Sequence, residues 1–408
     1  MNMAKPSFSL TYEQLLFDLH IAYFDARRHK RKRIYQIRFE ADMERNLRKL
    51  ADDLWHRTYK ARSSTCFIIS DPKKREVFAA DFRDRIVHHL YYNYTHRLFE
   101  RTFIHDSYSC IKGRGTHYGI ARLRSHIRKE SLNFTERCYI LKMDISGYFM
   151  QINREKLLEI CLRKLNSMRF HRINNKSSET WNEVLDFDFL TYLSKEIILL
   201  NPVENCRVRG SKSDWDLLPY NKSLFHSPIG CGLPIGNLTS QLFSNVYLGE
   251  LDQFMKRTLH CRRYGRYVDD FYVVSSDKEW LCSIIPHVRR YLTEQLYLTV
   301  NDGKTQINDS FRGVEYLGAY VKPHRTYVSR TSLNRIRRKL PKLNVIQSPF
   351  RMQSVVNSYL GIFSHYSAYR LKRQLFAVER LNHYGYFETG MKKYVPYSNY
   401  QNWITEWW

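Results

Sequence analysis

The sequence predicts an α+β fold in which a mixed core of strands and helices is flanked by helices at both ends. Helices and strands alternate without a regular strand–helix–strand repeat, which argues against a parallel α/β sheet. Short β-rich runs between residues 64 and 80 surround turn residues. Apolar residues recur at helical intervals near both ends of the chain. With 408 residues, the chain can bury a large core as one large domain or several smaller ones.

Two helices are predicted at the N-terminus. The first covers residues 12–29, where apolar side chains recur every three or four positions, and the second covers residues 43–54 with the same spacing. Between them lies the basic run RRHKRKR, residues 27–33. This run is interpreted either as a solvated linker or as a contact to an RNA backbone.

A β-hairpin and a helix follow. The runs CFIIS (66–70) and EVFAA (76–80) surround the turn DPKKR and predict two paired strands. The next segment, residues 82–103, is rich in His, Tyr and Arg and is predicted to be a helix.

The middle of the chain predicts strands that end at acidic residues. The apolar run CYILKM (138–143) predicts a buried strand that leads into Asp144. A long helix is expected from residue 238 to 259, and RRYGRYVDDFYVVSS (262–276) predicts two strands on either side of adjacent aspartates.

The C-terminal part is predicted to be mainly helical. A strand at residues 313–321 precedes a helical region from 331 to 381, which contains a basic stretch, residues 335–342. Aromatic residues at helical intervals in this region, residues 359–369, are interpreted as core rather than as stacking surfaces. The remaining residues, 386–408, carry no signal of a compact domain and are predicted to be a tail.

The charge of the chain predicts a polyanionic partner. Lys and Arg number 66 against 40 Asp and Glu, which gives a net charge of +26. The chain also contains 7 Trp, 30 Tyr and 23 Phe, and aromatic surfaces combined with positive charge suit single-stranded nucleic acid. Composition alone leaves a basic protein of a membrane surface as the alternative.

Other features of the sequence favour a cytoplasmic protein. We expect no spanning helix, because no run of about 18 apolar residues occurs, and the first residues lack the apolar core of a secretion signal. The eight cysteines form no CxxC pair and have no histidines at metal spacing. We therefore expect neither a zinc site nor a disulfide framework, and a reducing compartment.

Three carboxylates form the sharpest chemical pattern. Asp144 closes one apolar strand, and Asp269 and Asp270 lie at the turn between two others. Carboxylates at the ends of neighbouring strands repel one another, and bound divalent metal ions would offset this repulsion. Mg²⁺ prefers carboxylate oxygens and substrate phosphates, and two such ions can catalyse transfer of a nucleotide. An isolated Asp-Asp pair would be interpreted as an ordinary turn.

The motifs together resemble those of reverse transcriptases. YVDD after an apolar strand, with DISGYF upstream, is similar to the palm of these enzymes. The further similar blocks follow in the order of the family: KKREVFAADFRDRIVHH (73–89), GLPIGNLTSQ (232–241), LTVNDGKTQI (298–307) and VEYLGAYV (314–321). The resemblance spans about residues 64–321. It implies a right-hand polymerase with fingers, a palm of antiparallel sheet and helices, and a helical thumb.

The resemblance assigns the reaction to four side chains and one carbonyl. It implies that Asp144 and Asp269 bind two Mg²⁺ ions, with Asp270 beside them, and that the carbonyl of Ile145 completes the site. Lys304 matches the lysine that protonates the leaving pyrophosphate, and a solvated lysine at a strand end is the alternative for it.

The resemblance also assigns residues to the incoming nucleotide. Arg75 is expected to clamp the triphosphate, since guanidinium bridges phosphate oxygens with two bonds. Lys73 and Lys74 compete for the adjoining lysine role. Phe149 occupies the position of the steric gate, where a bulky ring excludes a 2′-hydroxyl, and an ordinary core phenylalanine is its alternative. The remaining nucleotide-binding residues implied are Ile235, Gly236 and Gln241.

One departure from the family points to a subgroup. Where many reverse transcriptases carry Gln-Gly, this sequence has Ile235-Gly236, a form that resembles the enzymes of diversity-generating retroelements, as do residues 213–225. Isoleucine cannot hydrogen-bond near the new base pair, so we expect low fidelity, mainly opposite template adenines. A neutral repacking of the pocket is the alternative.

Partners and localisation follow from this resemblance. It implies a structured template RNA, an RNA–cDNA duplex, deoxynucleoside triphosphates, a small basic accessory protein and no membrane, in the cytoplasm of a bacterium or encoded by a phage. The expected domains are an N-terminal helical extension (1–63), fingers and palm (64–321), a helical thumb (322–385) and a tail (386–408).

Two alternatives to this function are weighed. A phage-defence or retron reverse transcriptase would share the palm and the basic charge. From another class, a catalytically silent RNA-binding scaffold would keep the fold, but the intact Asp144, Asp269, Asp270 and Lys304 argue against it.

Overall fold

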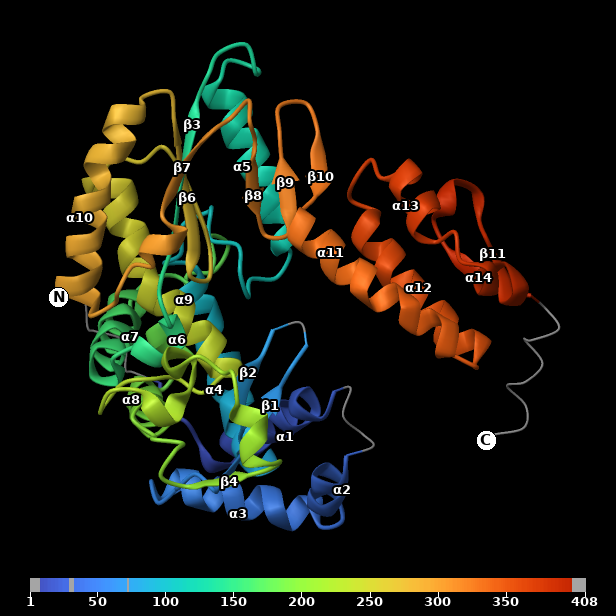
Figure 1. Cartoon of the computed structure of the whole chain (residues 1–408). Coiled ribbons are helices and arrows are strands. Elements are labelled where there is room, and N and C mark those ends of the chain that lie inside the picture. The colour runs from blue at the N-terminus through green and yellow to red at the C-terminus, as the bar shows by residue number, and fades with distance from the viewer. Residues whose placement is uncertain (1–7, 29–32, 72, 398–408) are drawn as a thin grey trace. The chain divides into compact units, whose positions relative to one another are not determined.

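The computed structural model describes residues 8–28, 33–71 and 73–397 (Figure 1). Its contacts divide the chain into two compact units. Unit 1 consists of Met1–Gly113, Met143–Phe271 and Ser283–Thr305, and unit 2 of Arg114–Lys142, Tyr272–Cys282 and Gln306–Trp408. The chain therefore passes between the units several times, and each unit is described by itself below.

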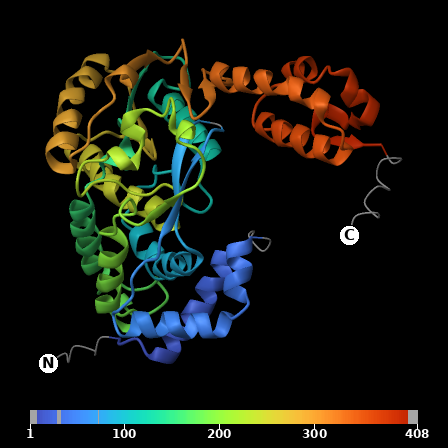
Figure 2. The same ribbon diagram turned by 60° about the horizontal axis from the view of Figure 1, so that its bottom comes forward.

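Unit 1 begins with three helices, α1 (Tyr12–Arg27), α2 (Ile34–Glu40) and α3 (Met43–Trp55), which lie beside one another in Figures 1 and 2. The hydroxyl of Thr11 accepts a hydrogen bond from the backbone N–H of Gln14 and so begins α1. The buried face of α1 packs against α4 (Phe82–Glu100). Both predicted N-terminal helices are confirmed, whereas residues 29–32 of the basic run lie outside the described residues.

The first sheet of unit 1 has the strand order β2–β1–β4. β1 (Ser64–Ile69) and β2 (Arg75–Ala79) form the predicted antiparallel hairpin, with Cys66 opposite Phe78, and β4 (Cys206–Val208) adds to β1 in parallel. Buried side chains alternate with less buried ones along β2 and the first half of β1, as expected for a sheet with one covered face.

A buried glutamate holds the segment after β4 against this sheet. The side chain of Glu76 on β2 accepts hydrogen bonds from Trp215 Nε1 (2.7 Å), Ser223 Oγ (2.8 Å) and the backbone N–H of Leu224 (2.6 Å). Both carboxylate oxygens are used, and Glu76 is only 1% exposed. Residues 215–224, which contain no long helix or strand, are thus fixed by one side chain.

The remaining helices of unit 1 surround the long helix α9. They are α6 (Tyr148–Gln151), α7 (Arg154–Met168), α8 (Phe187–Ile198) and α9 (Leu238–Gln253), which continues as a π-helical turn (Phe254–Thr258). α9 packs against α4 and α7 and is buried on nearly every side. Short 3₁₀ turns lie at Trp181–Glu183, Lys212–Trp215, Tyr220–Lys222, Leu224–His226 and Asp302–Lys304.

A four-stranded sheet has the order β5–β6–β3–β7. Its strands are β5 (Arg263–Tyr267), β6 (Asp270–Ser275), β3 (Tyr139–Asp144) and β7 (Gln306–Asp309). β3 pairs antiparallel with β7, from Tyr139 opposite Asp309 to Lys142 opposite Gln306. The predicted strands before and after the aspartates are confirmed. Helix α10 (Lys278–Leu296) follows β6.

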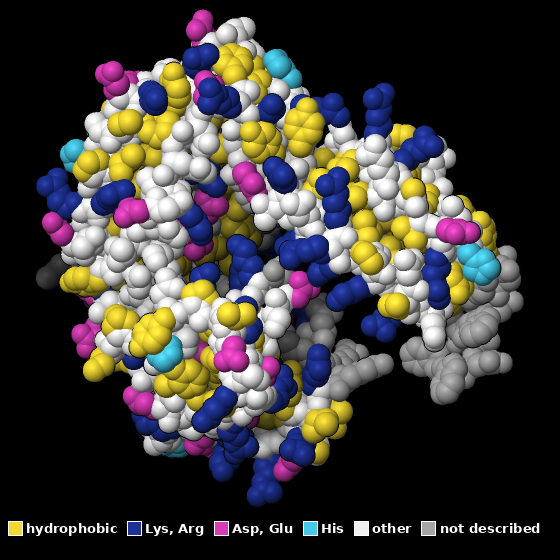
Figure 3. All heavy atoms as spheres, in the orientation of Figure 1, with side chains coloured by type: hydrophobic (Ala, Val, Ile, Leu, Met, Phe, Trp, Pro, Cys, Tyr) yellow, Lys and Arg dark blue, Asp and Glu magenta, His cyan; other side chains and the backbone are white. Residues whose placement is uncertain are grey.

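Unit 2 contains α5 (Thr116–Glu130) and a three-stranded antiparallel sheet of order β10–β9–β8. These strands are β8 (Val314–Tyr316), β9 (Ala319–Val321) and β10 (Thr326–Val328). Helix α11 (Arg330–Lys339) follows and carries Arg337, Arg338 and Lys339 in its last turn. On the face drawn in Figure 3, Lys and Arg side chains lie over this helix.

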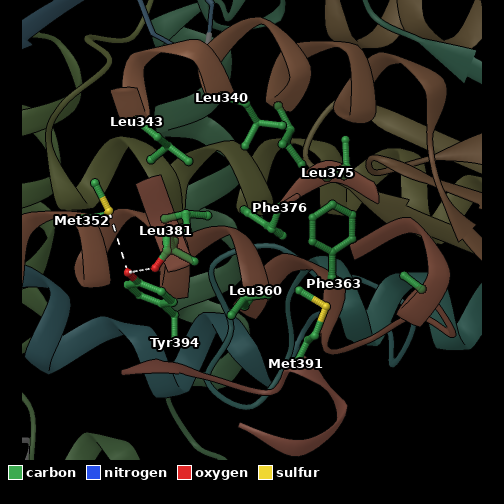
Figure 4. Packing of buried hydrophobic residues seen from close by; sticks show 13 residues of the cluster. Leu340, Leu343, Met352, Leu360, Phe363, Leu375, Phe376, Leu381, Met391 and Tyr394 are labelled. Atoms are coloured by element: carbon green, nitrogen blue, oxygen red, sulfur yellow. Dashed lines mark hydrogen bonds between the residues drawn. The ribbon is translucent and has the colours of Figure 1, made fainter. Parts of the chain in front are cut away.

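The C-terminal elements share one hydrophobic core. They are α12 (Pro349–Phe363), α13 (Tyr369–Leu375), α14 (Glu379–Tyr384), β11 (Gly385–Phe387) and β12 (Tyr394–Pro396), with 3₁₀ turns at Leu340–Val345 and Thr389–Met391. Figure 4 shows the Tyr394 hydroxyl donating to the carbonyl of Leu381 (2.7 Å) beside Met352. Phe363 is buried in this core, as predicted, whereas Tyr369 is half exposed.

The predicted tail is wrong for its first part. Residues 386–396 belong to the C-terminal core, because β11 pairs with β12 and because Met391 and Tyr394 are buried in the cluster. The sequence signal is weak here because the contribution comes from a few aromatic side chains on short strands. Residues 398–408 of the predicted tail lie outside the described residues.

The Glu76 cluster generates a stability prediction. In Glu76→Gln, the amide group would face one of the three donors, so a buried donor would lose its partner, and we expect the free energy of unfolding to fall by about 1–3 kcal/mol. Chemical denaturation measures this change. Glu136→Gln, at an exposed loop position, is the control. Equal stability of both variants would contradict the role of Glu76.

Candidate active site

Asp144 lies at the end of β3 and is held by the segment before Lys304. The backbone N–H of Asn301 donates to the Asp144 carbonyl (2.8 Å), and the next residues pair through an isolated bridge between Ile145 and Val300. The Lys304 ammonium donates to Asp144 Oδ2 at 2.6 Å. The sequence-predicted Asp144 and Lys304, which are far apart in the chain, are therefore in direct contact.

Asp269 lies in the turn between β5 and β6, and Asp270 begins β6. Burial and, next, the negative charge of Asp144 raise the pKa of Asp269 to about 6. The charges of Lys304 and Arg75 oppose this rise. A carboxyl group whose pKa is raised by another carboxylate lies within its electrostatic reach, so the fold brings Asp144 and Asp269 close enough to repel one another.

The carboxylates that disfavour the charge of Asp269 favour the charge of Lys304. Partial burial disfavours its charge, but the hydrogen bond and the charge of Asp144, with the charges of Asp269 and Asp270, raise its pKa overall. At neutral pH its ammonium is therefore protonated and bonded to a carboxylate. Such a group can act as a proton donor when its partner turns away.

The three aspartates have the donor chemistry of a magnesium site. Within the described residues, no three His, Cys, Asp or Glu side chains are grouped tightly enough to enclose a metal ion as they stand. Asp144 is paired with Lys304 instead. Carboxylate oxygens are the ligands that Mg²⁺ prefers, and a cation would relieve the repulsion that raises the pKa of Asp269. The residues thus fit Mg²⁺ on condition that Lys304 releases Asp144.

Among the three predicted triphosphate contacts, Arg75 has an electrostatic effect on Asp269. Arg75 begins β2 and its charge lowers the pKa of both Asp269 and Tyr267, against the larger effects that raise them. Lys74 donates from Nζ to the backbone carbonyl of Asp216. Lys73 is exposed on the turn before β2. Arg75 is therefore within electrostatic range of Asp269, while Lys74 is bonded to Asp216 in the segment 215–224.

Phe149 and Ile235 meet in one small apolar cluster. Both are partly buried and pack against a buried cluster that consists of Cys66, Phe78, Met150 and Leu224. The backbone N–H of Phe78 donates to the carbonyl of Ile235 (2.8 Å). Gly236 has φ +131°, and a Cβ there would lie 2.8 Å from the Phe78 carbonyl oxygen. The glycine is therefore required for this close approach. The fold brings Phe149 and Ile235 to one cluster, although they lie 86 positions apart in separate motifs.

The other two predicted residues take different positions. Ile145 is buried directly after Asp144, so its backbone is held beside the aspartates. Gln241 is exposed in the first turns of α9, where its side-chain oxygen accepts from the thiol of Cys110 at 3.5 Å.

Sequence reasoning did not find the supports of the site. Asn221 donates to Ser146 Oγ (3.1 Å), and its carbonyl oxygen would lie 2.5 Å from a Cβ at Gly147, whose φ is +50°. Residues 215–224 therefore touch both β2, through Glu76, and the turn after Asp144. Residues 213–225 enter the sequence analysis through the family resemblance, and nothing in their pattern indicates these partners.

Comparison with solved structures finds chains of low similarity. They include apo telomerase from Candida tropicalis truncated from its C-terminal domain (12% identity, TM-score 0.46, 65% of this chain and 55% of that one) and apo telomerase from Candida tropicalis (11%, 0.46, 79% and 61%). A third is telomerase from Candida albicans with a fragment of telomeric RNA (11%, 0.45, 79% and 57%). The chain spans little more than half of the length of these chains.

A search of curated proteins finds no match. A family model described as reverse transcriptase (RNA-dependent DNA polymerase) matches residues 71–321, which is more than half of the chain and contains the aspartates, Lys304, Arg75, Phe149 and Ile235. The chain therefore belongs to the reverse transcriptase family.

Proposed function

We propose that this chain is an RNA-directed DNA polymerase that adds deoxynucleotides to a primer on an RNA template. The observation that carries the proposal is the electrostatic pair of Asp144 and Asp269, with Lys304 bonded to Asp144. Buried like charges are costly unless a cation joins them. A nucleotidyltransferase supplies such cations together with the phosphates of its substrate.

The residues of the chain have separate tasks in this proposal. Asp144, Asp269 and Asp270, with the carbonyl of Ile145, would hold two Mg²⁺ ions. When bound, these ions activate the attacking hydroxyl and stabilise the leaving oxygen. Lys304 leaves Asp144 and, protonated, gives its proton to the departing pyrophosphate. Arg75 holds the triphosphate with two bonds.

The nucleotide pocket is the second part of the proposal. Phe149 excludes a 2′-hydroxyl by the bulk of its ring, and the ring is only partly buried against the apolar cluster, which leaves part of its surface for this contact. The side chain of Ile235 offers no hydrogen bond to the new base pair. At this position, only packing therefore restrains the geometry of the base pair. We propose that synthesis is error-prone, mainly opposite template adenines, as in diversity-generating retroelements.

The wider context belongs to the same proposal. We infer a structured template RNA, an RNA–cDNA duplex, a small basic accessory protein and a cytoplasmic setting in a bacterium or phage-infected cell. No helix within the described residues has the length and apolarity to cross a bilayer. The basic last turn of α11 supports a duplex contact by the region that we propose as thumb, residues 322–385.

The aspartates give the first test of activity. We expect Asp269→Asn to reduce primer extension on RNA by about 10³-fold or more, because an amide cannot replace a charged ligand of Mg²⁺. Extension with deoxynucleotides and Mg²⁺ measures this. Asp188→Asn, at an exposed position in the first turn of α8, is the matched control. Unchanged extension by Asp269→Asn would show that the active site lies elsewhere.

The ring of Phe149 gives a test of sugar selection. We expect Phe149→Ala to reduce the preference for deoxynucleotides over ribonucleotides by about 10²-fold, because the bulk beside the 2′ position is removed. Single-nucleotide incorporation with each substrate measures the ratio. Phe149→Tyr, which keeps the ring, should retain the preference. If Phe149→Ala keeps it too, Phe149 is a core residue without a selective role.

The fidelity proposal is tested at Ile235. We expect Ile235→Gln to lower misincorporation opposite template adenines roughly tenfold, because the amide can hydrogen-bond near the new base pair. Sequencing of cDNA measures the error rate at each template base. Ile235→Met, of similar length but without an amide, should keep the wild-type rate. Equal adenine error rates in all three proteins would remove the link to Ile235.

A further inference from the structure

The turn that carries Asp269 has a strained backbone. Val268, the residue before Asp269, has φ +54°, in the left-handed region. A β-branched residue is a rare outlier there, because its Cβ substituents clash with the backbone. Such a conformation persists only where the surrounding structure holds it. Since Val268 and Asp269 link β5 to β6, the conformation of Val268 sets the direction in which the Asp269 carboxylate projects.

Two hydrogen bonds hold Val268 from opposite sides. Nη1 of Arg266 donates to the carbonyl of Val268 at 2.9 Å, and the N–H of Val268 donates to Ser109 Oγ at 3.3 Å. Both polar groups of the strained residue are therefore engaged. Arg266 is 0% exposed, which is unusual for a charged residue of this size.

Helix α9 fixes the guanidinium of Arg266 in turn. Asp252 accepts from Arg266 Nε (2.8 Å) and Nη2 (2.6 Å) in a two-pronged pair, and Tyr264 donates to the same carboxylate (2.6 Å). Two helical turns earlier, Asn245 accepts from Arg266 Nη1 (3.3 Å) and from Ser109 Oγ (3.1 Å). One face of α9 thus orients both groups that hold Val268.

Stability alone does not explain why the Arg266–Asp252 ion pair is buried. Removing two charges from water costs about as much as their attraction returns, and apolar residues of similar volume often stabilise a protein equally well. The several N–H donors of a planar guanidinium group, in contrast, can bind a carboxylate and a backbone carbonyl at the same time. An apolar pair would fill the space but would release the carbonyl of Val268.

We propose that Arg266, oriented by Asp252, is a positioning residue that holds the turn at Val268 in its left-handed conformation and so aims the Asp269 carboxylate toward the metal site. The inference rests on the proposed function for its role in catalysis. The restraint on the turn itself is independent of that function. Arg266 touches neither substrate nor metal in this proposal and acts only through Val268.

The main test removes the ion pair without leaving a lone buried charge. We expect the full-length Arg266→Met/Asp252→Leu variant to fold, with a Tm lowered by the loss of partners for the Val268 carbonyl and the Tyr264 hydroxyl. Its kcat for deoxynucleotide incorporation should fall about 5- to 150-fold, which corresponds to about 1–3 kcal/mol. Its KM for the nucleotide should hardly change, because Arg75, Phe149 and Ile235 are intact. A folded variant with wild-type kcat would overturn the proposal.

A rescue separates positioning from general damage. Glycine adopts positive φ without a steric clash, whereas alanine keeps the Cβ. Added to the double variant, Val268→Gly should therefore recover part of the lost kcat, and Val268→Ala should not. Equal recovery by both, or by neither, would contradict a role through the backbone of Val268.

Two further measurements keep the proposal testable if extension or folding fails. Affinity for Mn²⁺, a paramagnetic substitute for Mg²⁺, is measured by electron paramagnetic resonance and should fall in the double variant and recover with Val268→Gly. If the wild type extends no primer but this Mn²⁺ pattern holds, the proposed function fails and the positioning role stands. If the double variant does not fold, Ser109→Ala removes one hydrogen bond to Val268 and should lower kcat and Mn²⁺ affinity several-fold; unchanged values would overturn the proposal.

Discussion

The approach of Asp144 and Asp269 to one another is the constraint on which the candidate active site depends. Asp144 ends β3 and raises the pKa of Asp269 beside β6, which burial has already raised. In a chain with a net charge of +26, this acidic spot forms only because the sheet forces these strand ends together. The Lys304 ammonium partly neutralises Asp144 through a 2.6 Å hydrogen bond. The charge of Arg75 on β2 acts against the rise in the pKa of Asp269. A cation bound between the carboxylates would reduce their repulsion.

The supports of the acidic residues and of the apolar cluster are connected. Glu76, buried on β2, fixes residues 215–224, and Asn221 of that segment donates to Ser146 just after Asp144. The same β2 accepts the close approach of Gly236 and contributes Phe78 to the cluster of Phe149 and Ile235. A displacement of β2 would therefore affect both halves of the site. This explains why a segment with little regular structure is held by buried, fully used hydrogen-bonding groups.

Elements that depend on local sequence were predicted well. The hairpin of β1 and β2, the strand that leads to Asp144 and the start of α4 at Phe82 all follow from alternation, helical spacing or turn residues. Predicted helix ends were less accurate, since the helix expected to reach residue 259 changes to a π-helical turn after Gln253. The packing of residues 386–396 was missed because Tyr394 is buried by partners on α12 and α14, which no local pattern reveals.

By itself, the sequence determined the chemistry of this protein: which carboxylates, cations and aromatic rings are present, and in which order the family motifs occur. Side-chain identity and local periodicity are properties of short segments, and they can be identified without a fold. Only the tertiary structure decided that Lys304 bonds Asp144, that Phe149 and Ile235 share one cluster, and that Asp252 orients Arg266 beneath the turn at Val268. These contacts join residues from separate elements, and their energies depend on burial and on ångström distances that arise when the elements pack.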